Sequence, residues 1–326
     1  IHDSLSAAVK RQLMSDVPYG VLLSGGLDSS ITSALAKKFA SKRVESNDKQ
    51  DAWWPQLHSF SVGLKGAPDL KAAKIVADHI GTVHHEINFT VQEGIDAIRD
   101  VIYHLETYDV TTVRASTPMY LMARAIKSLG IKMVLSGEGA DELFGGYLYF
   151  HKAPSPEEFQ KECIRLIQDV QHFDVLRGDK TTAGNGLEIR VPFFDKQFVK
   201  EYMSIDPQLK VVRNGFEKYL LRKAFESENI IPNDVLWRPK EAFSDGCSSE
   251  NRSWHKIIQE YINTIITDKE FNENKDKYKF NTPMTKESYL YRKVFEDYYP
   301  NKSNVIPHYW LPNWSSEIDP SARELR

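Results

Sequence analysis

The sequence lacks the features that mark disulfide-rich, nucleic-acid-binding or membrane proteins, and is typical of an ordinary globular protein. Its 326 residues include only two cysteines, Cys163 and Cys247, which form neither a metal-ligand spacing nor a disulfide framework and so favour a reducing compartment. A formal net charge of −3 provides no basic field, so nothing supports a nucleic-acid partner. No apolar run approaches the roughly 20 residues that cross a bilayer, so no membrane partner is expected. The remaining expectation is a cytoplasmic enzyme or binding protein.

Smaller absences narrow the class further. The ten histidines lack the H-x-x-H and H-E-x-x-H spacings of metal-binding helices. The N-terminus has no secretory signal pattern. The chain begins with Ile1 rather than Met, so we expect it to be a piece of a longer protein. What is present, 41% hydrophobic and 27% charged residues, suits one large globular domain or two of ordinary size.

The most distinctive stretch is VLLSGGLDSS at residues 21–30. Residues 21–23 continue an apolar run typical of a buried strand, residues 24–26 form a small turn, and Asp28 opens an amphipathic helix. A strand, a Gly-rich turn and a helix N-terminus together offer backbone N–H groups to phosphate. A P-loop would add a lysine, but none precedes Lys37, and a carboxylate stands in the turn instead. This pattern favours a Mg²⁺-bound pyrophosphate, although an ordinary strand–helix turn with a capping Asp shows the same pattern.

Hydrophobic periodicity predicts alternating strands and helices up to about residue 150. Strands are expected at 21–23, 57–64, 82–89 and 131–135, helices at 4–14, 28–38, 69–79, 91–108 and 116–129, and an exposed polar loop at 41–52. This alternation predicts an α/β fold with a doubly wound parallel sheet. Ligands of such sheets lie beyond the carboxyl ends of the strands, at a switch in strand order. A second Gly-rich turn, residues 136–147, follows a strand too, so both turns should lie on that edge.

The alternation of predicted strands and helices ends at about residue 150. Helices are expected at 156–171, 198–203, 217–228 and 289–299, with no convincing strand. The strongly polar stretch 267–287 is interpreted as a mobile surface segment. We therefore divide the chain into an α/β nucleotide-binding core, residues 1–150, and a mainly helical remainder, residues 151–326, packed against the sheet.

Two more clusters carry groups suited to chemistry. In the second Gly-rich turn, Asp141 is suited to metal ligation and Glu138 to a polar or base role, while helix capping explains both equally well. In the polar loop expected at 108–116, Arg114 could clamp a substrate carboxylate or phosphate, although a structural loop capped by Ser116 is the simpler reading.

A third cluster, residues 237–246, places Lys240 among aromatic residues and glycine. This lysine could supply the cation that the first turn lacks, although an isolated lysine is more often a solvated surface charge. Nearby, Glu188, Arg190 and Asp195 are more typical of a structural ion-pair network than of catalysis.

These clusters, in this order, resemble the synthetase domain of the glutamine-dependent asparagine synthetases. Residues 24–29 resemble the PP-loop of ATP pyrophosphatases, a signature that GMP, NAD and argininosuccinate synthetases and tRNA-modifying enzymes share. The stretches 108–116, 136–142, 147–154 and 237–241 narrow the resemblance, which covers nearly the whole chain. It implies an adenine-nucleotide α-hydrolase-like fold.

The activity that this resemblance implies is a two-step ligation that needs ATP and Mg²⁺. Aspartate is adenylated to β-aspartyl-AMP with release of pyrophosphate, and ammonia then yields asparagine and AMP. The family carries an upstream glutaminase domain with an N-terminal Cys nucleophile; because no such residue is present here, this chain is expected to use free ammonia. A homodimer is compatible with the resemblance. The alternatives are a PP-loop ligase for another carboxylate, like β-lactam synthetase, and a non-catalytic nucleotide-binding protein.

The resemblance also assigns residues to the nucleotide. It places five positions at the pyrophosphate: Ser24, Gly25, Gly26, Asp28 and Ser29. It places Leu23 and Val62 at the adenine pocket. It places Ser136 and Gly137 near the nucleotide.

The remaining assignments concern metal and chemistry. Asp28 and Asp141 would hold the metal, and Glu138 would serve the ammonia step. Thr111 and Arg114 would orient aspartate or the intermediate. Lys240 would neutralise charge on the phosphates.

Overall fold

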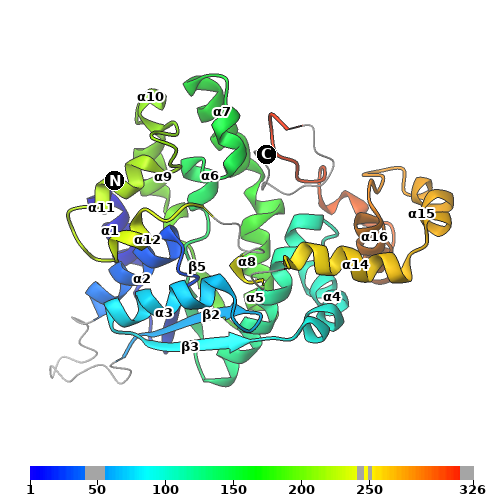
Figure 1. Cartoon of the computed structure of the whole chain (residues 1–326), viewed down its shortest axis with the longest axis horizontal. Coiled ribbons are helices and arrows are strands. Elements are labelled where there is room, and N and C mark those ends of the chain that lie inside the picture. The colour runs from blue at the N-terminus through cyan, green and yellow to red at the C-terminus, as the bar shows by residue number, and fades with distance from the viewer. Residues whose placement is uncertain (41–55, 241–245, 249–251, 316–326) are drawn as a thin grey trace.

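A computed structural model, which describes residues 1–40, 56–240, 246–248 and 252–315, contains a five-stranded, fully parallel sheet (Figure 1). The strand order is β3-β2-β1-β4-β5. The strands are β1 (Tyr19–Leu22), β2 (His58–Gly63), β3 (Val83–Asn88), β4 (Met133–Leu135) and β5 (Glu188–Arg190). The predicted α/β class and parallel sheet are confirmed. The polar loop predicted at 41–52 lies outside the described residues.

The fifth strand corrects the prediction that no strand follows residue 150. β5 has only three residues and pairs with β4 in the register Met133↔Glu188 and Leu135↔Arg190. It is an edge strand with a single apolar residue, Ile189, so it carries no alternation that a sequence pattern could reveal. Only the neighbouring strand makes it part of the sheet.

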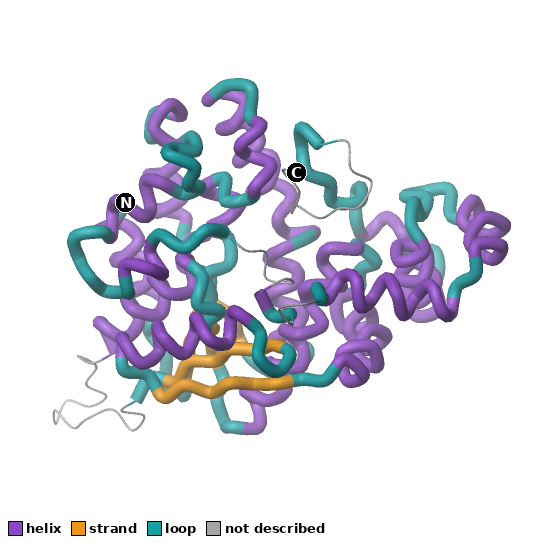
Figure 2. Tube along the Cα trace, in the orientation of Figure 1, coloured by secondary structure: helices purple, strands orange, loops and turns teal. Residues whose placement is uncertain are grey.

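Alternate strand residues face opposite layers of helices. Val21 and Leu23 belong to one apolar cluster with the helices on one face, whereas Leu22, Phe60 and Val62 belong to a second cluster on the other. The first layer contains α1 (His2–Gln12), α2 (Leu27–Ala40) and α3 (Pro68–Ile80). The second contains α4 (Val91–Leu105), α5 (Val110–Ser128), α14 (Trp254–Ile265) and α16 (Lys286–Tyr298). Helices therefore cover both faces of the sheet (Figure 2).

Local signals explain several helix boundaries. Thr90 and Glu93 form a reciprocal capping box at the start of α4, and Gly81, with φ of 70°, ends α3. The remaining α-helices are α6 (Ala140–Phe144), α7 (Pro156–Asp169), α8 (Asp174–Ala183), α9 (Lys196–Met203), α10 (Pro207–Lys210), α11 (Tyr219–Phe225), α12 (Asn233–Leu236) and α15 (Asp268–Asn274). Short 3₁₀ helices are η1 (Leu148–Lys152), η2 (Val170–His172), η3 (Pro192–Phe194), η4 (Lys275–Lys277) and η5 (Ser303–Val305). No helix within the described ranges has both the length and the apolar character needed to cross a bilayer.

The polar loop predicted at 108–116 is wrong: most of it forms the first turns of α5. Asp109 caps this helix by accepting a hydrogen bond from the backbone N–H of Thr112 at 2.9 Å. The run of β-branched residues at 110–113 and the interior Pro118 are weak helix formers, so the pattern placed the helix start too late.

Part of the stretch 267–287 is helical, and its mobility stays a prediction. It contains α15, which Thr267 caps, and the ring of Phe271 packs against Tyr289 at 5.9 Å. The polar composition concealed these aromatic contacts. At its end Glu287 is 2% exposed.

Both main apolar clusters combine residues from before and after residue 150. Val134 shares one cluster with Trp254, and Leu135 shares the other with Phe193. The helical remainder thus packs on the sheet as expected, and a boundary at residue 150 stays a prediction.

Candidate active site

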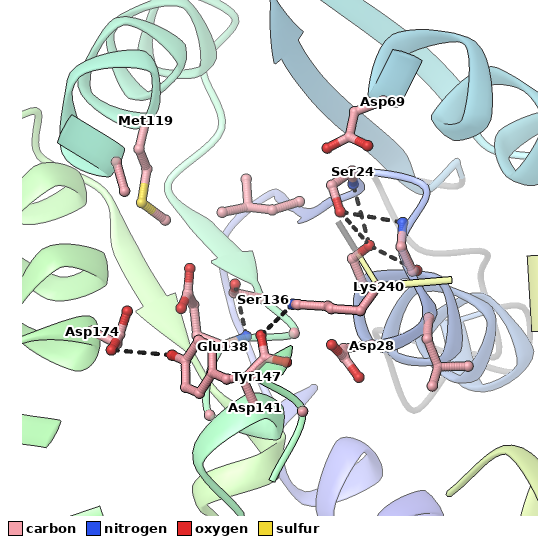
Figure 3. A pocket seen from close by; sticks show the side chains of 18 of the residues that line it. Ser24, Asp28, Asp69, Met119, Ser136, Glu138, Asp141, Tyr147, Asp174 and Lys240 are labelled. Carbon is pink, nitrogen blue, oxygen red and sulfur yellow. Dashed lines mark hydrogen bonds and ion pairs between the residues drawn. The ribbon is translucent and has the colours of Figure 1, made fainter. Parts of the chain in front are cut away.

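A cavity of about 370 Å³ lies at the carboxyl edge of the sheet, where the chain leaves β1 and β4 (Figure 3). The two Gly-rich turns meet there: a Cβ atom on Gly137 would stand 2.6 Å from the backbone nitrogen of Ser29. Glycine is therefore the residue that permits this approach. The prediction that both turns lie on one edge is confirmed.

The first turn is held by its own hydroxyl groups. The Oγ atoms of Ser24 and Ser29 lie 3.0 Å apart, and the N–H of Gly26 donates to Ser24 Oγ at 3.3 Å. Gly25 has φ of 77° and packs so closely on α3 that a Cβ would stand 2.4 Å from the nitrogen of Ala73. The positive end of the 14-residue helix α2 thus faces the cavity and favours an anion.

Two carboxylates and two lysines form the centre of the cavity; we call Asp28, Asp141, Lys218 and Lys240 the paired-lysine cluster. Lys240 Nζ lies 2.5 Å from Asp141 Oδ2, and Figure 3 shows its side chain extending toward that carboxylate. Lys218 Nζ contacts Asp28 and lies 2.6 Å from Asp141 Oδ1. The expected approach of Lys240 to the acidic turns is therefore observed, and Lys218 is a second cation that the sequence analysis missed.

Charge in this cluster is balanced. Burial alone would raise the pKa of Asp141, but Lys218 and Lys240 outweigh it and hold that pKa well below its usual range. Burial would lower the pKa of Lys240, and Asp141 and Asp28 reverse the shift, so its pKa is raised. Asp141 and Lys240 are therefore both charged near neutral pH.

A second group, which we call the acidic wall, contains Glu138, Glu142, Tyr147, Asp174 and Arg177. Arg177 donates to Glu138 at 2.7 Å and lies 2.6 Å from Asp174 Oδ1. The Tyr147 hydroxyl donates to Glu142 and lies 3.4 Å from Asp174 Oδ2. The wall thus contains three carboxyl groups and one guanidinium, which pairs with Glu138 and Asp174.

The pKa values of Glu138 and Glu142 shift in the opposite direction from that of Asp141. Burial raises the pKa of Glu138, Asp174 adds to the rise, and Arg177 opposes it. Burial, Asp174 and Asp141 raise the pKa of Glu142 well above its usual value. The wall is therefore suited to holding or accepting protons.

Helix α5 contributes Thr111 and Arg114 to the cavity lining. The guanidinium of Arg114 forms a buried bidentate pair with Glu287 of α16, at 2.6 and 2.5 Å. Thr111 Oγ1 donates to Asp109 at 2.7 Å. A substrate role for Thr111 and Arg114 stays a prediction, and their positions on the cavity are compatible with it.

Part of the cavity lining is apolar. Leu23 and Val62, together with Phe60, Met119 and Met122, line this part of the cavity. Their apolar surface suits the flat face of a nucleobase.

Thirteen of the fourteen predicted site residues line the cavity, namely Leu23, Ser24, Asp28, Ser29, Gly26, Val62, Thr111, Arg114, Ser136, Gly137, Glu138, Asp141 and Lys240. Gly25 does not, because it packs beneath the turn against α3. Residues that the sequence analysis missed are Asp69, Tyr147, Asp174, Arg177, Lys218, Arg238 and Trp310. Apart from Tyr147 and Arg238, which lie in stretches noted for family resemblance, they carry no local pattern that separates them from ordinary polar or aromatic residues.

A Gly-rich turn at a helix N-terminus, balanced lysines and carboxylates, and an apolar recess are together typical of one class of protein. They define an α/β protein with a site suited to a phosphate-bearing nucleotide.

Comparison with known proteins identifies the family within this class. A family model described as asparagine synthase matches residues 1–158 and 153–322, so the chain belongs to the asparagine synthase family. It is 53% identical to a probable glutamine-hydrolyzing asparagine synthetase of Dictyostelium discoideum, over 99% of this chain and 59% of that protein. It is 56% identical to asparagine synthetase B of Escherichia coli (92% and 53% covered) and 50% identical to the Homo sapiens enzyme (98% and 55% covered). The chain thus spans about half the length of the curated relatives it matches.

Proposed function

We propose that this chain carries the synthetase reaction of asparagine synthesis: aspartate attacks ATP to give β-aspartyl-AMP and pyrophosphate, and ammonia then displaces AMP. The observation that carries the proposal is the paired-lysine cluster beside a Gly-rich turn at a helix N-terminus. The names of the relatives, all asparagine synthetases, support aspartate over another acid.

The first turn and the lysines are suited to the triphosphate. Backbone N–H groups at the start of α2 and the hydroxyls of Ser24 and Ser29 would bind phosphate oxygens. Lys218 and Lys240 would neutralise the charge that develops as pyrophosphate leaves. Because both ammonium groups are already held by carboxylates, they need little reorganisation when the nucleotide binds.

The carboxylates of the same cluster fit Mg²⁺. The buried Oδ1 of Asp28 has no hydrogen-bond partner among the described residues, so it is available to a cation. No three His, Cys, Asp or Glu side chains in the described ranges form a metal site of their own. That suits Mg²⁺, which is commonly bound through one or two carboxylates plus substrate phosphates. Asp28 and Asp141 would hold it, and when bound it would supply charge neutralisation at the pyrophosphate.

The α5 side and the acidic wall are suited to the acid and to the amine. Helices α5 and α8 pack together, and Figure 3 places Met119 of α5 and Asp174 of α8 on the same side of the cavity. Arg114 and Thr111 would orient aspartate there. Glu138, with its raised pKa, would take a proton from the attacking ammonia nitrogen.

The source of ammonia belongs to the same proposal. The relatives are named as glutamine-hydrolyzing, and the missing half of their length would hold the glutaminase domain that the family resemblance implies. We propose free ammonia as the direct nitrogen donor to this chain. A homodimer, which is compatible with the family resemblance, is also part of the proposal.

The test is to mix the chain with ATP, Mg²⁺, aspartate and an ammonium salt. Pyrophosphate and asparagine should appear in equal amounts, and neither should appear without aspartate. If a different carboxylate supports turnover and aspartate does not, that carboxylate is the substrate instead of aspartate. Nucleotide binding without pyrophosphate release would indicate a non-catalytic member of the family.

A further inference from the structure

The segment that follows α16 returns to the cavity. We call residues 306–314 the C-terminal strap; its red trace runs from α16 toward α7 in Figure 1. Asn281 Nδ2 donates to Ile306 O at 3.3 Å at one end, and Asn313 Nδ2 donates to Glu162 Oε2 of α7 at 2.7 Å near the other. The strap is therefore fixed to Asn281 at one end and to α7 near the other.

One buried carboxylate joins the strap to the helix that lines the cavity. Asp109 is fully buried, and its Oδ1 accepts the backbone N–H of Trp310 at 3.1 Å. Its Oδ2 accepts the hydroxyl of Thr111 and the hydroxyl and N–H of Thr112, at 2.7, 2.7 and 2.9 Å. The position of Trp310 is thus coupled to the first turn of α5, which carries Thr111 and Arg114.

Trp310 forms part of the cavity wall. It is 4% exposed, and its ring centre lies 5.7 Å from that of Tyr147 and 6.3 Å from that of Tyr149. Tyr147 in turn contacts Glu142 and Asp174. Trp310 therefore stands between the acidic wall and the start of α5, an apolar surface among polar groups.

We propose that Trp310 is a positioning residue that closes the acid-binding end of the site against water and limits the size of the carboxylate substrate. This inference rests on the proposed function, because that reaction proceeds through an acyl adenylate. If a water oxygen attacks the acyl carbon, the bond from that carbon to the AMP oxygen breaks, aspartate is regenerated, and ATP is converted to AMP and pyrophosphate without asparagine. A buried indole at this place removes room for that water.

The test compares Trp310→Ala and Trp310→Phe with Trp314→Ala, and measures pyrophosphate, asparagine and both KM values. Trp314 is a matched control because it belongs to the same strap, but its ring packs on Phe150 at 6.0 Å rather than on the cavity. In Trp310→Ala the ratio of pyrophosphate to asparagine should rise from one to several, and the KM for aspartate should rise about tenfold, the scale of a lost apolar contact. The KM for ATP should stay within twofold. Trp310→Phe should restore most of the coupling, and Trp314→Ala should keep the ratio at one.

Two outcomes overturn the inference in an enzyme that makes asparagine. One is a ratio of one with an unchanged aspartate KM in Trp310→Ala; the other is an equal rise in both alanine variants, which would make the strap only structural. If Trp310→Ala does not fold, Trp310→Leu and Trp310→Phe replace it, with the larger ratio expected for Leu. A wild-type chain without aspartate-dependent pyrophosphate release would instead refute the proposed function itself.

Discussion

The paired-lysine cluster and the acidic wall line the same cavity but differ in charge. The first has two carboxylates and two lysines, and its Asp141 has a lowered pKa. The second has three carboxyl groups and one guanidinium, and its Glu138 and Glu142 have raised pKa values. The difference suits the two steps of the proposed reaction: balanced charge with a helix N-terminus suits a polyanion, whereas an excess of acid suits proton transfer from an amine.

The largest effect should come from the carboxylate nearest the first turn. Asp28→Asn should lower pyrophosphate release by about 100-fold or more, because it removes a charge from the metal and phosphate end. Circular dichroism and the unfolding temperature should show an intact fold. The exposed Asp276→Asn is the matched control and should keep full activity. Unchanged turnover in Asp28→Asn would refute the metal role.

The two lysines should separate catalysis from stability. Lys240→Met should lower turnover by about 100-fold with little loss of stability, because Lys240 is partly exposed. Lys218→Met should lower turnover and also cost about 3–5 kcal/mol in the free energy of unfolding, since Lys218 is buried between two carboxylates. Urea titration of both variants measures the difference. An equal loss of stability would contradict the distinction between them.

The Arg114–Glu287 pair offers a smaller effect on the acid end. Glu287→Gln keeps the shape but removes the charge that orients Arg114, so the KM for aspartate should rise about tenfold and that for ATP should not. Glu296→Gln, on the same helix and paired with Arg292 at 3.0 Å, is the control and should leave both KM values unchanged. If the ATP KM rises as much as the aspartate KM, Glu287 has a general structural role instead.

The smallest effect is a pH dependence of opposite sign at the two groups. Glu142 has a raised pKa in the folded state, so its contribution is present below the unfolded value of about 4.5 and is lost as pH rises toward the folded pKa. Asp141 has a lowered pKa, so its contribution is present above about 3.8 and is lost on further acidification.

Unfolding temperatures measured from pH 3 to 8 check both signs. Glu142→Gln should flatten the fall in stability above about pH 4.5, and Asp141→Asn should flatten the fall below about pH 3.8. If the stability of the wild-type chain instead rises above about pH 4.5 and Glu142→Gln removes that rise, the acidic wall is ionised in the folded state.

The sequence by itself determined four of the five parallel strands, both Gly-rich turns and the edge on which they meet. These features rest on local signals: apolar alternation, glycine where a turn or a close approach requires it, and acids at helix starts. The same local signals misplaced the start of α5, where β-branched residues and Pro118 hide the helix. They also missed β5, because a strand of three residues is too short to show an alternating pattern.

Only the tertiary structure decided which side chains complete the cavity. Lys218 is 190 residues from Asp28, Glu287 is 173 residues from Arg114, and Trp310 is 201 residues from Asp109. Periodicity assigns a residue to a face of its own helix, but it does not say which distant element that face will meet. That choice follows from how the helical layers pack on the sheet and bury their charges together, which is a property of the whole chain.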